Sequence, residues 1–182
     1  FKSGELGKAI LNYERAQTLL PRNADLRANY RYARSMVQGK EVPAGGFWNW
    51  LPLRLYRRNL TVNEMVVLSS TAYMLIILML IVAVIKPSSR RIVFAAAVAI
   101  AILILINTAV IWHKASEISR RGVTVAPRTE ALFGPYPSAT KFFTLSEGMK
   151  VEVTGRRNGW LKVRRSDGNV GWVPKSDVEM VR

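Results

Sequence analysis

Two apolar runs, residues 65–85 and 92–112, dominate the pattern of hydrophobic and polar positions, and neither contains a charged residue. Each would form a helix about 32 Å long at a rise of 1.5 Å per residue, close to the thickness of a bilayer's hydrocarbon core. The joining residues 86–91 include a proline, two serines and three basic residues. We therefore expect a transmembrane hairpin over residues 62–112. The alternative is a soluble helical hairpin, which would need a partner to cover all its sides.

The first 39 residues have the apolar spacing of two helices. Apolar residues recur every three or four positions from Leu6 to Leu20 and again from Leu26 to Val37. Pro21 ends the first predicted helix, and Asn23 or Asp25 can cap the second. Residues 1–39 are therefore expected to form a helical hairpin.

The small residues of this first helix resemble those of the second helix of a tetratricopeptide repeat. The matching positions are Gly4, Ala9, Tyr13, Ala16 and Pro21. The resemblance implies a glycine in the turn, alanines at a close helix contact and a proline at the end of the repeat. Arg31 falls where the repeat usually has a small residue, so the second helix is expected to be a terminal cap. Because one repeat cannot bury its apolar face alone and the chain starts at Phe1, we expect a further repeat upstream. An ordinary helical hairpin is the alternative.

A segment of mixed aromatic and basic residues follows within residues 40–61, after a linker that is rich in glycine and proline. Aromatic rings settle at headgroup depth in a bilayer and arginines reach the phosphates, so this segment is expected at the membrane–water interface. The expected interfacial residues are Trp48, Trp50, Tyr56, Arg57, Arg58 and Trp112. Thr61 and Glu64 have capping-box spacing, which places the start of the first membrane helix near Val62.

The second apolar run contains two pairs of alanines spaced four apart, Ala95 with Ala99 and Ala97 with Ala101. Such spacing permits close backbone approach, against either the first helix or a helix of another protein. Asn107 is expected to form an interhelical hydrogen bond. Neither run has a charged residue, so proton or ion transport is not expected. Basic residues flank the hairpin on both sides, so charge alone does not set its orientation.

The pattern changes to period two after a linker or helix extension at residues 113–121. Alternating segments at 123–125, 149–153, 161–164 and 170–173 predict strands, and the hairpin turns Asn158-Gly159 and Asp167-Gly168 separate the last three. Residues 122–182 are therefore expected to form a small all-β barrel.

The barrel resembles a bacterial SH3-like domain through residues 145–148, 158–163 and 167–173. The resemblance implies a binding or docking module whose ligands contact the variable loop 133–143. Tyr136 and Trp160 are the candidate ligand surface. Trp172 is expected to be a core or structural residue, and for Trp160 such a position and a ligand-binding position both stay open.

The chain's 182 residues carry a net charge of +15, one histidine and no cysteine. No arrangement typical of a catalytic, phosphate-binding or metal site is present, so we expect neither an enzyme nor a cofactor. The basic charge suits nucleic acid or anionic lipid, and lipid is favoured because no base-reading motif accompanies the charge.

The order of helical repeat, two membrane helices and SH3-like barrel resembles the BatE-type proteins of bacterial aerotolerance (Bat) operons. The fold class is thus a multi-domain membrane protein. The resemblance implies a two-pass scaffold in the inner membrane, with both flanks extracytoplasmic and residues 86–91 cytoplasmic. It also implies partners with von Willebrand factor A-type (VWA) domains and a MoxR-type ATPase. The alternatives are a sensor or anchor that binds peptidoglycan peptides and, less favoured, a cytoplasm-facing adaptor or nucleic-acid binder.

Overall fold

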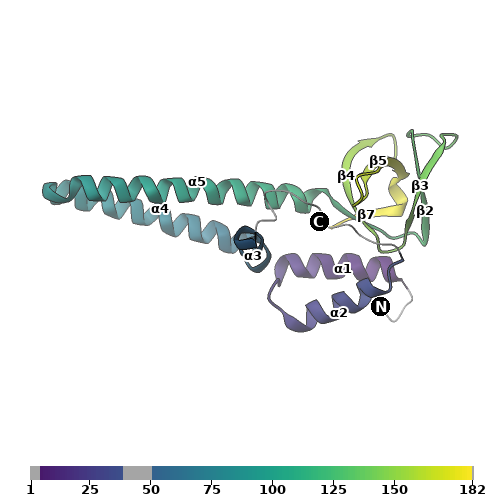
Figure 1. The fold of residues 1–182 in the computed structure, drawn as a ribbon, viewed down its shortest axis with the longest axis horizontal. Coiled ribbons are helices and arrows are strands. Elements are labelled where there is room, and N and C mark those ends of the chain that lie inside the picture. The colour runs from purple at the N-terminus through teal and green to yellow at the C-terminus, as the bar shows by residue number, and fades with distance from the viewer. Residues whose placement is uncertain (1–4, 39–50, 182) are drawn as a thin grey trace. The chain divides into compact units, whose positions relative to one another are not determined.

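The computed structural model describes residues 5–38 and 51–181 and divides into two compact units. Unit 1 comprises Phe1–Arg54 and Glu117–Arg182, and unit 2 comprises Leu55–Ser116 (Figure 1). The helical and β segments, expected as separate modules, thus fall within one unit that is discontinuous in sequence. Three of the expected site residues, Gly4, Trp48 and Trp50, lie outside the described residues.

Unit 1 begins with two antiparallel helices, α1 (Leu6–Leu19) and α2 (Ala24–Ser35), where the apolar spacing predicted them. Asn23 is the N-cap of α2, because its Oδ1 accepts a hydrogen bond from the backbone N–H of Leu26 at 2.8 Å. The N-terminal region is therefore helical, with its turn at Pro21.

The C-terminal part of unit 1 is an antiparallel sheet of seven strands. They are β1 (Arg121–Thr124), β2 (Arg128–Leu132), β3 (Lys141–Ser146), β4 (Lys150–Arg157), β5 (Trp160–Arg164), β6 (Val170–Pro174) and β7 (Val178–Met180). Their order in the sheet is β3-β2-β6-β5-β4-β1-β7, and a 3-10 turn, η3 (Lys175–Asp177), precedes β7. Four strands were predicted from period two, while β2, β3 and β7 were not. Strand β3 begins inside the segment 133–143 that was expected to be a loop.

Two clusters of buried side chains form the core of unit 1. The first lies within the sheet and includes Leu145, Val151, Val163 and Val173. The second joins the helices to the sheet and consists of Ile10, Leu11, Tyr30, Ala33, Val123 and Val181. The helical pair therefore buries its apolar face against β1 and the end of β7.

Two glycines permit this close approach. A Cβ on Gly7 would lie 2.6 Å from the carbonyl oxygen of Thr124, and the Gly7 N–H donates to Oε1 of Glu147 at 2.7 Å. Gly148 has φ +76°, and a Cβ there would lie 2.5 Å from Cδ1 of Ile10. Helix α1 can therefore lie directly on β1 and on the turn between β3 and β4.

Unit 2 contains most of α3 (Leu51–Asn59), all of α4 (Val62–Ile85) and most of α5 (Arg90–Arg120), with a 3-10 turn, η2 (Pro87–Ser89), between the last two. The predicted capping box starts α4, because Thr61 Oγ1 accepts from the N–H of Glu64 while the Thr61 N–H donates to the Glu64 carboxylate. Of the two alternatives expected at 113–121, a linker or a helix extension, the structure has the helix extension, because α5 continues to Arg120.

The seam of the α4–α5 hairpin has a nearly heptad spacing. Its partly or fully buried positions in the apolar part of α4 are Met65, Ser69, Ala72, Ile76, Met79 and Ala83. Those of α5 up to Ile111 are Val93, Ala96, Ala97, Ile100, Ile104, Asn107, Val110 and Ile111. Ala97 is buried, whereas Ala95, Ala99 and Ala101 are exposed. The predicted alanine pairs thus do not act as pairs within the hairpin, because the seam uses alternating steps of three and four residues.

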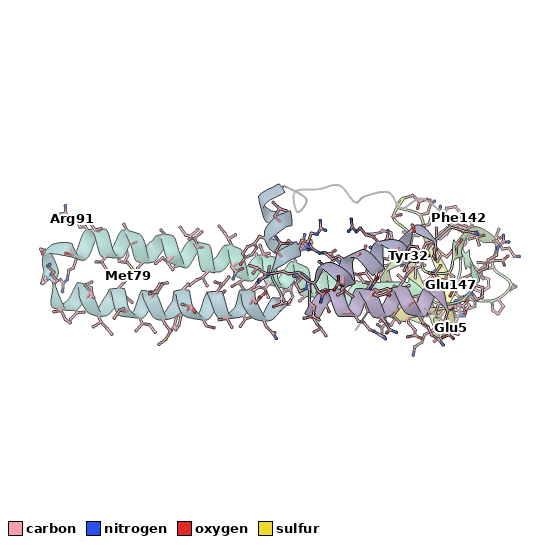
Figure 2. All side chains as sticks on the ribbon, turned by 90° about the horizontal axis from the view of Figure 1, so that it is seen from below. Glu5, Tyr32, Met79, Arg91, Phe142 and Glu147 are labelled. Carbon is pink, nitrogen blue, oxygen red and sulfur yellow. The ribbon has the colours of Figure 1, made fainter. Side chains whose placement is uncertain are left out.

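Two helices, Val62–Ile85 and Pro87–Arg120, are long and apolar enough to cross a membrane, with mean hydropathies of 2.5 and 2.7. In their apolar windows, only 0% and 6% of the residues are buried. Figure 2 shows the side chains of both helices projecting outward along their length, with Arg91 beside the turn. A core helix of a soluble protein would be mostly covered, so these helices lack the covering that a soluble hairpin needs.

Candidate functional site

An exposed group of aromatic rings lies at the tip of the β2–β3 hairpin. Phe133, Tyr136 and Phe142, which we call the aromatic patch, are 61%, 55% and 43% exposed. The ring centroids of Phe133 and Phe142 are 4.4 Å apart, and the ring of Phe142 meets that of Phe143 edge-on at 5.3 Å. A cluster of exposed apolar rings on a soluble surface is typical of an interaction site.

Local backbone geometry builds the patch. Ala131 pairs with Phe143 and Leu132 pairs with Lys141, so Phe142 is the extra residue of a β-bulge. A bulge turns its side chain away from the regular alternation of a strand, which accounts for the exposure of Phe142. The ring of Tyr136 rests on Gly134, where a Cβ would lie 2.5 Å from the tyrosine ring.

A charged pair borders the patch. The guanidinium of Arg165 lies 4.7 Å from the ring centroid of Phe143 and donates to Oδ2 of Asp167. The hydrogen bond from Arg165 lowers the pKa of Asp167 to about 2. Because Asp167 offsets its charge, Arg165 contributes to the patch mainly as a planar group stacked on an aromatic ring.

Trp160 lies at the other end of the β5–β6 hairpin from the patch. Trp160 pairs with Pro174, whereas Arg164, at the far end of β5, pairs with Val170. The patch belongs to that far end, where Arg165 stacks on Phe143 and also donates to the Thr144 carbonyl. The structure therefore does not join Tyr136 and Trp160 into the single surface that the sequence suggested.

Trp172 is half-buried and lies outside the core, so the core position that the sequence allowed for it is wrong. Strand β6 alternates so that Gly171 and Val173 face inward and Trp172 faces outward. The Nζ of Lys162 lies 5.9 Å from the Trp172 ring centroid, in a cation–π contact on this outer face.

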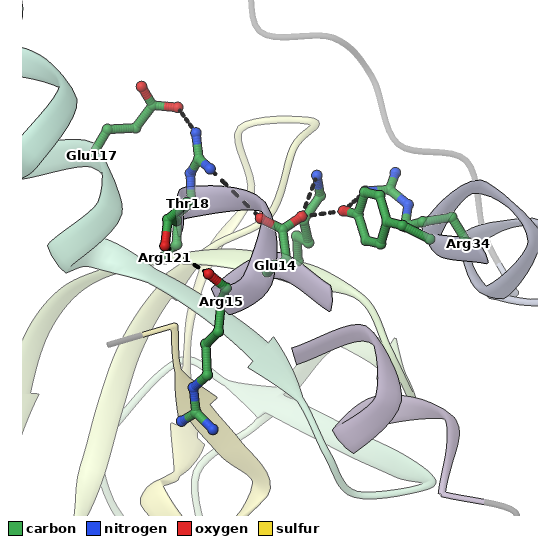
Figure 3. A network of polar contacts seen from close by, with 8 residues as sticks. Glu14, Arg15, Thr18, Arg34, Glu117 and Arg121 are labelled. Carbon is green, nitrogen blue, oxygen red and sulfur yellow. Dashed lines mark hydrogen bonds and ion pairs between the residues drawn. The ribbon is translucent and has the colours of Figure 1, made fainter. Parts of the chain in front are cut away.

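The helical pair carries a buried acid that sequence reasoning missed. Glu14 of α1 is only 3% exposed and contacts groups from three other elements (Figure 3). It accepts a hydrogen bond from the Tyr30 hydroxyl of α2, and its carboxylate oxygens lie 3.5 Å from Arg121 Nη1 of β1 and 3.1 Å from Lys150 Nζ of β4. Arg121 also pairs with Glu117, and Arg34 donates to the Tyr30 hydroxyl. We call Glu14, Tyr30, Arg121 and Lys150 the Glu14 cluster.

Burial by itself would raise the pKa of Glu14. Lys150, the Tyr30 hydroxyl and Arg121 outweigh the burial, so the pKa of Glu14 is lowered and the carboxylate is charged. Burial and the neighbouring carboxylate raise the pKa of Tyr30. The Glu14 cluster therefore ties the helices to the sheet through contacts from both sides.

Among the residues of the tetratricopeptide pattern, Ala9 is buried, and Tyr13, Ala16 and Pro21 are half-buried. The ring of Tyr13 lies 6.2 Å from that of Tyr30, and Tyr13 packs against the cluster that joins α1 to β1. Ala9 and Tyr13 thus take part in the packing within unit 1.

In unit 2, Asn107 forms the expected interhelical hydrogen bonds. Its Nδ2 donates to the Met65 carbonyl at 3.0 Å and to Ser69 Oγ at 2.7 Å, and its Oδ1 accepts from the Tyr56 hydroxyl at 2.7 Å. Lys114 Nζ donates to the carbonyls of Arg57 and Leu60, at and just beyond the end of α3. The Asn107 amide thus links α3, α4 and α5.

The other expected interfacial side chains differ in exposure. Trp112 is 77% exposed and Arg58 is exposed, whereas Tyr56 and Arg57 are half-buried. Within residues 5–38 and 51–181, no three His, Asp or Glu side chains are grouped to hold a metal ion.

The comparisons bear on the C-terminal sheet of unit 1. No curated protein matches the chain as a relative. No tetratricopeptide-repeat family matches the helical pair, so this resemblance stays a prediction. Residues 133–179, from the first ring of the aromatic patch to the middle of β7, match the family described as "Bacterial SH3 domain".

Proposed function

We propose that this protein is a non-enzymatic membrane-anchored scaffold, whose SH3-like barrel binds a partner protein through the aromatic patch. The family match supports a binding module, since such domains bind proteins or cell-wall material. The observation that carries the proposal is the contact between the rings of Phe133 and Phe142, both exposed on a hairpin of the barrel. Rigid, exposed aromatic rings are the side chains that contribute most to protein interfaces.

The anchor in this proposal is the α4–α5 hairpin, placed in the bacterial inner membrane with both flanks extracytoplasmic. Support comes from the length, hydropathy and exposure of the two helices. By its resemblance to BatE-type proteins, the scaffold would work with VWA-domain membrane proteins and a MoxR-type ATPase.

The test is photo-crosslinking of the tagged full chain in bacterial membranes, with a benzophenone amino acid at position 136. We expect cross-links to a VWA-domain membrane protein, and the double change Phe133→Ser with Phe142→Ser should abolish them. Lys141→Ser, on the same strand but paired with Glu130, is the matched control and should leave them intact. Cross-linking that persists without both phenylalanines would refute the role of the patch.

Binding to the cell wall is the second candidate, because the SH3 match is compatible with it. Purified sacculi would then retain the full chain in detergent, and the Phe133→Ser, Phe142→Ser variant would be released. Retention of both forms alike would assign any wall binding to another surface. Protease access to the barrel in spheroplasts tests the orientation, since complete protection would exclude an extracytoplasmic barrel.

A further inference from the structure

Basic side chains without an acidic partner gather at the β4–β5 end of the barrel. Of the six basic residues that the structure describes elsewhere on the barrel, all but Arg128 form ion pairs: Arg121 with Glu117, Lys141 with Glu130, Lys150 with Glu14, Arg164 with Glu152 and Arg165 with Asp167. In contrast, Arg156, Arg157 and Lys175 form no ion pair with any residue that the structure describes. Residues 153–165 and 168–176 contain no acid at all. Unpaired positive charge is therefore concentrated on this part of the sheet.

Backbone contacts bring these residues together. Arg156 and Arg157 end β4, and the turn Asn158-Gly159 returns the chain to Trp160 of β5. Arg157 pairs with Trp160, which pairs in turn with Pro174 of β6. The backbone N–H of Lys175 donates to the Gly159 carbonyl at 2.9 Å, which places Lys175 beside the same turn.

The outer face of β5 extends this group. Leu161 and Val163 point into the core, so Trp160 and Lys162 lie on the opposite face, where Lys162 meets the ring of Trp172. We call Arg156, Arg157, Trp160, Lys162 and Lys175 the basic rim. Its four basic residues are exposed, and Trp160 is half-buried among them.

The combination of exposed basic side chains and an indole ring in the basic rim suits contact with the headgroup region of a bilayer. Indole rings settle at headgroup depth, and Lys and Arg side chains near an anionic leaflet are attracted to its phosphates. The chain itself contains two helices long and apolar enough to cross a membrane, and β1 starts at the residue that follows α5. A barrel tethered so closely meets lipid at a high effective concentration, so weak contacts suffice. We propose that the basic rim binds the anionic headgroups of a lipid bilayer.

This binding is separate from the proposed partner site, because the rim and the aromatic patch lie toward opposite ends of the β5–β6 hairpin. A barrel bound to lipid through the rim keeps the patch open to a partner. Loss of either surface should leave the other working.

The absence of cysteine permits a direct test with the full chain in lipid nanodiscs. Exposed Ser176, next to Lys175, is changed to Cys and labelled with an environment-sensitive dye, and exposed Ser138, on the loop between β2 and β3, is the matched control. Discs contain phosphatidylcholine alone or mixed equally with phosphatidylglycerol. We expect the dye at position 176 to shift to the blue and to be quenched by headgroup-labelled lipid only in the anionic discs. The dye at position 138 should not respond.

The double change Arg156→Gln with Arg157→Gln should lower the association constant for lipid docking about 25-fold, at about fivefold for each charge. Arg164→Gln, whose charge is already paired with Glu152, is the control and should lower it far less. Because all three side chains are exposed, thermal unfolding of the variants should match that of the parent. Added salt should reverse the blue shift and the quenching of the dye at position 176, since ions screen the attraction between the rim and the anionic headgroups.

The proposal would be overturned if the fluorescence of the dye at position 176 did not respond to phosphatidylglycerol. A response to single-stranded RNA or polyglutamate in neutral discs together with no response to anionic lipid would also overturn it, because the rim would then bind a soluble polyanion. Equal loss of docking in the Arg164→Gln control would refute the assignment to unpaired charge.

Discussion

Removing the charge of Glu14 should loosen the helical pair from the sheet. The change Glu14→Gln keeps the size of the side chain, but it abolishes the attraction to Lys150 and Arg121 and weakens the hydrogen bond from Tyr30. Breaking a buried ion pair can cost about 3–5 kcal/mol when the remaining charge stays buried. Here the Lys150 and Arg121 side chains are 35% and 38% exposed and regain water, so we expect a loss of about 2 kcal/mol.

For a domain of about 100 residues, this loss lowers the melting temperature by roughly 10 °C. The assay is thermal unfolding of the full chain in detergent, followed by amide hydrogen exchange of α1 and α2. Exchange in the two helices should rise more than exchange in β5 and β6, because the Glu14 cluster joins the helices to β1 and β4. Glu130→Gln, which removes an exposed pair with Lys141, is the control and should cost about 0.5 kcal/mol or less.

The pH dependence gives a second readout. Because the folded-state pKa of Glu14 is below its ordinary value of 4.5, the stabilisation is fully present above pH 4.5 and is lost as the pH falls through the lower, folded-state value. The parent should lose this stability in acid, and Glu14→Gln should lose less. If Glu14→Gln unfolds like the parent, or follows the same acid profile, the reasoning about the buried carboxylate is wrong.

Two further changes test other contacts. Asn107→Ala removes the hydrogen bonds that link α3, α4 and α5 and should lower the free energy of detergent-induced unfolding by about 1–2 kcal/mol. The control Thr108→Ala should cost less, because its hydroxyl bonds only within its own helix. Equal losses in the two variants would contradict the bridging role of Asn107. Gly148→Ala combines a positive φ with a collision at Ile10, whereas a Cβ at Gly168 meets open space. Gly148→Ala should therefore destabilise unit 1 by about 1 kcal/mol more than Gly168→Ala. Similar melting temperatures of the two variants would disprove the close approach of α1 to this turn.

Local signals in the sequence were sufficient to predict where α2 and α4 begin. The side chains of Asn23 and Thr61 cap helices through hydrogen bonds to residues three positions ahead, so a short window contains all the information. The same holds for the turn Asn158-Gly159, in which both residues have positive φ.

Contacts between residues that lie far apart in the sequence could not be predicted. Glu14 looks like an ordinary surface acid of an amphipathic helix, because Arg121 and Lys150, which make its burial tolerable, lie more than 100 positions away. Apolar residues on both faces of β6 left the inward face undecided, which is why the sequence allowed a core position for Trp172. The exposure of Phe142 depends on a bulge whose signal is the register with β2, and no single strand contains that register.

The hydrogen bond between Gly7 and Glu147 spans 140 positions, and its consequence concerns synthesis on the ribosome. At about 5–20 residues per second, the ribosome needs on the order of ten seconds after completing α2 to reach β4. During that interval Ile10 and Leu11 have no sheet to cover them, while α4 and α5 are still being made. The nascent helical pair is then a candidate for chaperone binding, and a ribosome stalled between α2 and β1 would leave it without its core.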